Sequence, residues 1–160
     1  MKILAAAVLL AGAALAVNPQ LAAVHTVYLL PMAGGMDQYL AGRLTERGVV
    51  QVVADPQRAD AVLTDHLGQA FEDRMNEIYA PAKKPTETSS QTFEPPRTPV
   101  STFGRGRGAF FLVDRRTRAV LWSVYESPRS TRSADLEHTA DRIAKELATA
   151  IKNAVNPNKK

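Results

Sequence analysis

Residues 133–155 place their apolar side chains along one helical stripe, and this restricts the fold more than any other feature. The spacing predicts an amphipathic helix that Ser133 caps and that Asn156-Pro157 ends. A helix with one apolar face has to cover another element. The stripe is rich in alanine and only about three heptads long, so packing on a sheet of the same domain is favoured over a coiled-coil seam. Its members are Leu136, Ala140, Ile143, Leu147, Ala150, Ile151 and Ala154.

Five short runs of β-branched and aliphatic residues predict the strands of that sheet. They lie at 24–30, 49–54, 61–64, 109–113 and 118–125. The first run is apolar on both faces, apart from His25 and Thr26, and is therefore expected in the interior of the sheet. The last two runs flank Asp114-Arg115-Arg116-Thr117, which predicts a hairpin.

Two further helices are expected between the strands. One should run from Asp37, as its cap, to Arg47, with Gly48 as its left-handed stop. A short one is predicted over 69–79, where large apolar residues recur at helical spacing. The order is therefore strand, helix, strand, strand, short helix, loop, strand, strand, helix. It predicts an α/β or α+β fold with a single mixed sheet of about five strands and helices packed on it. The first strand–helix–strand unit should be a right-handed parallel crossover.

The hairpin also predicts part of the core. In its second strand Val120, Trp122 and Val124 should face one way, and Leu121 and Tyr125 the other. We expect Trp122 to be buried between sheet and helices, together with the apolar residues Phe111, Leu63 and Leu147.

Residues 1–16 have the layout of a secretory signal peptide. Lys2 provides a positive start, an apolar run follows from 3 to 16, and Ala14-Leu15-Ala16 is a small-x-small cleavage site. The run is too short for a membrane anchor, which needs about 20 apolar residues. We expect export to the periplasm or the medium as a soluble protein without a transmembrane span. Residues 17–160 would then form one globular domain.

The amino-acid composition excludes several kinds of bond and binding site. The 160 residues contain no cysteine, which removes disulfides, thiolate metal sites and a lipid-modified cysteine. Residues 81–100 hold five prolines among many Ser and Thr, so 81–107 should be a mobile, proline-rich loop. The run from Gly104 to Gly108 alternates glycine and arginine, but it precedes a strand rather than a helix, which excludes a dinucleotide-binding or P-loop motif.

No catalytic constellation emerges from the residues. The three histidines, His25, His66 and His138, do not have metal-ligand spacing, and no Gly-x-Ser-x-Gly elbow is present. Asp65-His66 could orient a nucleophile, but such pairs are common. We expect neither a cofactor nor a metal.

Arginine is concentrated in one segment. Residues 97–132 hold eight arginines and two acids, a net charge of +6 in a chain of net charge +4. Such a segment could bind envelope proteins, an anionic polymer or lipid head groups. The other interpretation is a solvated basic face, and export argues against nucleic acid as a partner. The candidate binding residues are Arg105, Arg107, Arg115, Arg116 and Arg118.

Several short motifs resemble small periplasmic α/β domains. Such domains occur in the curli-secretion channel subunit, in lipoprotein activators of penicillin-binding proteins and at the amino terminus of the Tol-system propeller protein. The chain departs from them in lacking a lipidation cysteine and in its proline-rich segment. The motifs are Leu29-Leu30-Pro31-Met32, Leu40-Ala41 with Leu44, 49–53, Ala59-Asp60-Ala61-Val62-Leu63-Thr64, Leu112-Val113-Asp114 and Ala119-Val120-Leu121-Trp122-Ser123.

The resemblance implies a non-enzymatic envelope domain that docks on protein partners. The alternative is an envelope hydrolase or an anionic-ligand-binding protein that uses the arginine-rich segment 97–132.

Overall fold

A computed structural model describes residues 18–79 and 108–157. The predicted signal peptide, the proline-rich loop and the candidate residues Arg105 and Arg107 lie outside these ranges. The strands are β1 (Thr26–Leu29), β2 (Gln51–Val52), β3 (Ala61–Thr64), β4 (Ala109–Asp114) and β5 (Val120–Tyr125). The α-helices are α1 (Met36–Arg47), α2 (Gln69–Tyr79) and α3 (Ser133–Val155), and short 3-10 turns occupy Pro19–Ala23, Ala33–Gly35 and Pro56–Arg58.

The five strands form one mixed sheet in the order β2-β1-β3-β4-β5. β1 is parallel to both of its neighbours, β2 and β3, whereas β4 is antiparallel to β3 and to β5. The predicted single sheet with an interior first strand is therefore confirmed. β2 has only two residues because the chain leaves the sheet for the turn at Pro56, so the predicted strand over 49–54 was too long.

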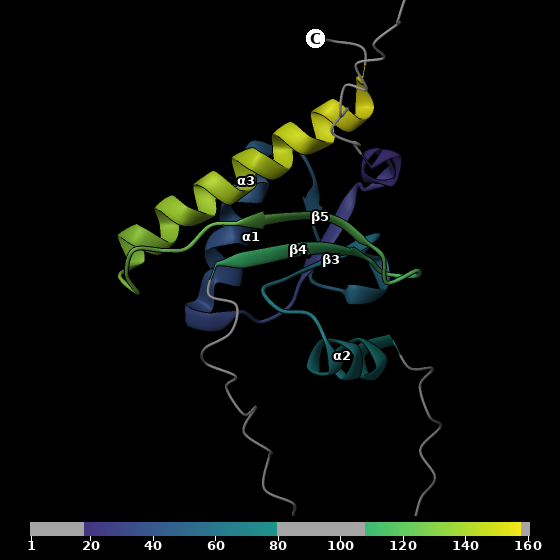
Figure 1. Ribbon diagram of the computed structural model, residues 1–160, viewed down its shortest axis with the longest axis horizontal. Coiled ribbons are helices and arrows are strands. Elements are labelled where there is room, and N and C mark those ends of the chain that lie inside the picture. The colour runs from purple at the N-terminus through teal and green to yellow at the C-terminus, as the bar shows by residue number, and fades with distance from the viewer. Residues whose placement is uncertain (1–17, 80–107, 158–160) are drawn as a thin grey trace, which may run out of the picture.

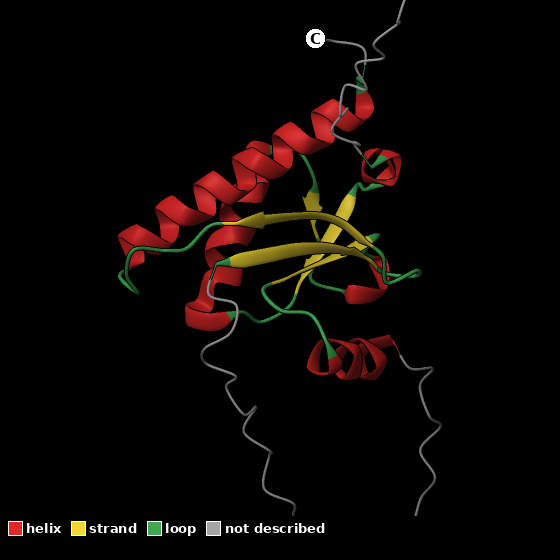
Figure 2. Ribbon diagram, in the orientation of Figure 1, coloured by secondary structure: helices red, strands yellow, loops and turns green. Residues whose placement is uncertain are grey.

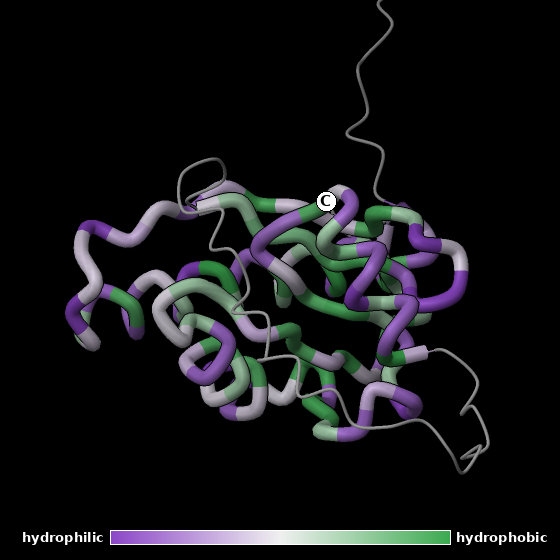
Figure 3. Tube along the Cα trace, turned by 90° about the horizontal axis from the view of Figure 1, so that it is seen from below, coloured by the Kyte–Doolittle hydropathy of each residue, from purple (hydrophilic) through white to green (hydrophobic). Residues whose placement is uncertain are grey.

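Helices cover the two faces of the sheet unequally. Helices α1 and α3 lie together on one face and α2 lies on the other (Figure 1, Figure 2). The larger apolar cluster lies under α1 and α3, and the smaller one joins Phe71 and Met75 of α2 to Val62 and Val113 of the sheet. Along the helices the trace alternates between hydrophobic and hydrophilic residues (Figure 3), as expected for helices that each bury one side.

Helix α3 packs on its own domain, as predicted. Leu136, Ile143 and Leu147 of the stripe are buried in the larger cluster. On its rim α3 forms ion pairs with α1, from Arg47 to Asp141 at 2.6 Å and from Arg43 to Glu137.

Both predicted helix caps were wrong in detail. The N-cap of α3 is Arg132 rather than Ser133, and the hydroxyl of Ser130 donates instead to Asp135 in the first turn. Helix α1 begins at Met36, and the Asp37 carboxylate accepts the N–H of Met32 at 3.1 Å. The C-terminal prediction is confirmed, because Gly48 has φ 61° and donates to the last turn of the helix.

A bulge changes which residues of β5 face the core. Leu112 is paired with Trp122 and Val113 with Val120, which leaves Leu121 as an extra residue. Leu121 therefore packs in the larger cluster, with Trp122 against it, and Val120 is exposed, so the predicted alternation was wrong.

The predicted core group is likewise only partly correct. Leu63 and Leu147 are fully buried together, whereas Trp122 is half-buried at the margin of their cluster. Phe111 lies on the other face of the sheet, beside α2, because adjacent strand residues point to opposite faces.

None of the helices within 18–79 and 108–157 is both long enough and apolar enough to cross a membrane.

Candidate functional site

Three of the predicted binding residues, Arg115, Arg116 and Arg118, lie in the tight turn between β4 and β5. Asp114 shapes this turn. One oxygen of its carboxylate accepts the N–H of Arg116 at 2.9 Å, and the N–H and hydroxyl of Thr117 at 2.6 and 2.9 Å. Arg118 closes the turn in the left-handed region, with φ 62°.

These hydrogen bonds determine the charge of Asp114. Partial burial would raise the pKa of Asp114, but the donors of Thr117 and Arg116 outweigh it and hold the pKa below its ordinary value. Asp114 is therefore an ionised structural acceptor, and it is not poised to donate a proton near neutral pH.

Two of the three arginines are occupied by the fold itself. The guanidinium carbons of Arg115 and Arg118 lie 5.7 and 5.8 Å from the centre of the Tyr79 ring, within cation–π range. Arg115 also donates to the backbone oxygen of Gln57, and Nε of Arg118 lies 3.9 Å from Glu72. These contacts attach the hairpin to α2 and to the 3-10 turn at Pro56–Arg58.

Tyr79 is the centre of this attachment. Its hydroxyl donates to the backbone oxygen of Pro56 at 2.9 Å, and burial raises its pKa. Arg118 Nη1 is buried and has no hydrogen-bond partner among the described residues, and the guanidinium is stabilised by the Tyr79 ring and by Glu72. Of the three predicted binding residues within the described part of the chain, Arg116 alone is exposed.

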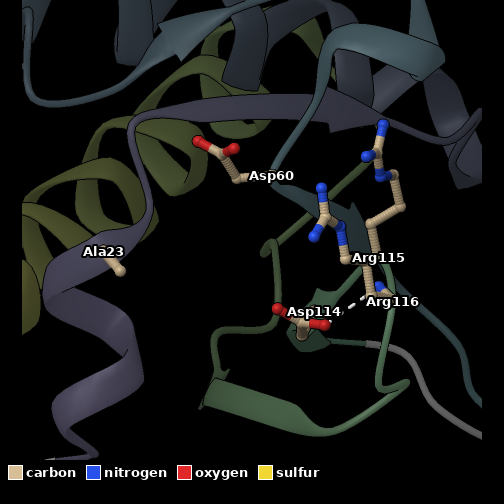
Figure 4. Close-up of a pocket in the computed structure, with 5 residues that line it drawn as sticks. All are labelled: Ala23, Asp60, Asp114, Arg115 and Arg116. Carbon is tan, nitrogen blue, oxygen red and sulfur yellow. Dashed lines mark hydrogen bonds between the residues drawn. The ribbon is translucent and has the colours of Figure 1, made fainter.

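A shallow hollow lies beside the turn, lined by Asp60, Asp114, Arg115, Arg116 and Ala23 (Figure 4). Asp60 was not predicted as a site residue, although the Ala59-Asp60 pair at the start of the third strand was a visible signal. Its carboxylate accepts the N–H groups of His25 and Thr26 at 3.0 and 2.9 Å. It thereby joins the start of β3 to the start of β1.

Asp60 has the same electrostatic character as Asp114. Partial burial would raise the pKa of Asp60, but the backbone donors of His25 and Thr26 lower it below its ordinary value. The hollow thus combines two ionised carboxylates with two arginines. Because both pKa values are lowered, neither carboxyl group is protonated near neutral pH, as a general acid would have to be.

The Asp65-His66 pair forms at the other end of β3. His66 Nδ1 lies 2.7 Å from Asp65, whose second oxygen accepts the N–H of Ala33 at 3.0 Å. A hydrolytic site of the triad type would also need a side-chain nucleophile next to the imidazole. Within the described ranges the only side-chain hydroxyl bonded to His66 is that of Thr64, and it bonds the backbone.

The remaining histidines lie on other elements. His25 precedes β1, His138 lies on α3, and both are exposed. The described part of the chain holds no group of three potential metal ligands.

The outer edge of β5 is a second candidate site, which sequence reasoning missed because it could not supply the strand order. β5 ends the sheet next to β4 (Figure 1). It carries two exposed large apolar side chains, Val120 at 43% and Tyr125 at 72% exposure. Monomeric proteins usually protect a strand of this kind, so an accessible one is a potential contact surface.

Comparison with family models, with curated proteins and with solved structures found no match for this chain.

Proposed function

We propose that this chain is an exported, non-enzymatic accessory module of the bacterial cell envelope, and that it acts by docking on protein partners. The observation that carries the proposal is the edge strand β5, which presents Val120 and Tyr125 beside an arginine-rich turn. Tyrosine and arginine are the residue types enriched where proteins bind one another.

The other polar groups support docking over chemistry. Asp60 and Asp114 are committed to backbone donors, and Arg115 and Arg118 to Tyr79. These residues hold the hairpin and the strand ends rigid, and a rigid edge loses little freedom when a partner binds.

Two sequence features support the envelope as the location. The layout of residues 1–16 is that of a signal peptide, and the strand and hairpin motifs resemble small periplasmic domains that dock on other proteins. The alternative is a hydrolase acting through segment 97–132. Among the described residues its candidate catalytic pair is Asp65-His66, and that pair lies at the opposite end of β3 from the arginine turn.

Site-specific photo-cross-linking in the native host tests the proposal. A photoreactive amino acid replaces Tyr125 in one strain and Lys145, which is exposed on α3, in a control strain. We expect a discrete cross-linked envelope protein from position 125 that position 145 does not yield. Equal cross-linking from both positions, or none from position 125, would contradict docking through this edge.

A further inference from the structure

The backbone of β5 presents hydrogen-bonding groups in two directions. Glu126 donates to Gly108, and Asp114 donates to Ala119, which marks both as hydrogen-bonded pairs of the β4–β5 ladder. Such pairs alternate along an antiparallel ladder. The pairs Phe110–Val124 and Leu112–Trp122 therefore bond to each other, and the backbone groups of Ser123 and Tyr125 point away from β4.

The hydrogen bonds between β3 and β4 are consistent with this alternation. Arg115 donates to Asp60, so the odd-numbered residues of β4 bond to β3 and the even-numbered ones to β5. The N–H groups of Ser123 and Tyr125 therefore point away from β4, to the side of β5 where the described residues form no strand. The outer edge thus offers the donors and acceptors that an added strand requires.

Positive charge flanks this edge at both ends. Arg116 is exposed in the turn that precedes β5, and Arg129 and Arg132 are exposed in the segment that follows it. The acid nearest to the strand end, Glu126, is paired with Arg142 on α3. An extended segment lying along β5 would run between two segments of the chain that each carry exposed arginine.

From these observations we infer that β5 accepts an extended, acidic segment of a partner protein as a sixth strand of the sheet. The inference rests on the proposed docking function and names the chemistry of its partner. Backbone hydrogen bonds to Ser123 and Tyr125 supply the pairing, and the flanking arginines select an acidic segment over a basic one. The bulge at Leu121 limits regular pairing to the second half of the strand.

A pair of synthetic peptides tests the inference on the mature protein. One is a capped peptide with alternating Val and Thr in its centre and two glutamates at each end, and its twin carries lysines in their place. We expect the acidic peptide to bind about tenfold more tightly than the basic one, with a preference that weakens as salt is added. Bound acidic peptide should slow amide exchange at Ser123 and Tyr125.

Two variants separate strand addition from charge. Ser123→Pro removes an outward N–H that β4 does not use, so its melting curve should stay close to that of the control Ser123→Ala, and its affinity should fall about tenfold. If Ser123→Pro does not fold, Arg116→Glu with Arg132→Glu tests the charge instead, and should abolish the preference for the acidic peptide.

The inference is overturned if the two peptides bind equally, or if Ser123 and Tyr125 gain no protection. It is also overturned if phosphatidylglycerol vesicles compete for the protein and bind the Ser123→Pro variant as well as the wild type, because the arginines would then serve lipid. A cross-link from position 125 that survives in the Ser123→Pro background would leave the docking function in place and remove strand addition alone.

Discussion

Asp60 joins two strands through one carboxylate, which makes it the clearest case of a residue that serves structure rather than chemistry. Asp60→Ala leaves the N–H groups of His25 and Thr26 without their acceptor, although water can reach them. We expect a loss of about 1–2 kcal/mol in the free energy of unfolding, measured by urea denaturation. Glu146→Ala, on the exposed side of α3, is the control. A variant as stable as this control would show that the link contributes nothing.

Lowering the pH should weaken the hydrogen bonds that the carboxylates of Asp60 and Asp114 accept. The pKa values of Asp60 and Asp114 are lower in the folded protein than the ordinary value. Their stabilisation is therefore complete above the unfolded-state pKa, about 3.9, and is lost as pH falls through the lower folded-state pKa. Urea denaturation of the wild type should show stability falling below about pH 5, with a shallower fall in the Asp60→Asn, Asp114→Asn double variant. Parallel curves would contradict this assignment.

Gly108 occupies a position that only glycine fits. Its φ is 101°, and an added Cβ would lie 2.8 Å from Cα and 2.9 Å from N of Ser127. We expect Gly108→Ala to cost about 2–3 kcal/mol in thermal or urea denaturation. The matched control is Gly42→Ala, in α1, where an added Cβ meets nothing within 4 Å and the substitution should be neutral or stabilising. Equal effects of the two substitutions would contradict the close approach of Gly108 to Ser127.

At the scale of the element, burial separates two aromatic residues. Phe71 of α2 is 2% exposed, whereas Trp122 is half-buried at the margin of the larger cluster. Phe71→Ala should therefore cost about 3–4 kcal/mol, and Trp122→Ala distinctly less, because water already reaches part of the indole. Denaturation of both variants checks the ranking. A larger loss of stability for Trp122→Ala than for Phe71→Ala would contradict this ranking and would indicate that Trp122 lies at the centre of the core.

The element scale also shows where sequence reasoning succeeds and where it stops. Apolar runs and apolar spacing predicted five strands and three helices, because the helices bury one side and an interior strand such as β3 buries both. The bulge at Leu121 could not be predicted from the apolar spacing, since it depends on the pairing of Val113 with Val120. Both missed helix caps have the same cause, because a cap depends on local geometry as well as on residue type.

At the scale of the whole molecule, the strand order determines which residues meet at the arginine-rich turn and which strand has an open edge. The arginine-rich turn was visible in the sequence, but the contacts of Arg115 and Arg118 with Tyr79 join segments that are distant along the chain. For the same reason Asp60 was seen only as part of a motif. The open edge at β5 could not be predicted, because the residues of this strand do not show which strands lie beside it. The first strand, which is apolar on both faces, could be placed in the interior.

Export is also a property of the whole chain. If residues 1–16 are a cleaved signal peptide, mass spectrometry of the protein from its native host should find an amino terminus at or near Val17. The cell-envelope or extracellular fraction should contain that form. A cytoplasmic protein that retains Met1 would remove the envelope from the proposed function.

Residue-resolved amide hydrogen exchange of the protein alone tests the central claim, that β5 presents an open edge, most directly. Trp122 and Val124 should exchange slowly, because their amides are in the ladder with β4, whereas Ser123 and Tyr125 should exchange orders of magnitude faster. Slow exchange at all four amides would contradict the account, because it would mean that the outer edge of β5 is already covered.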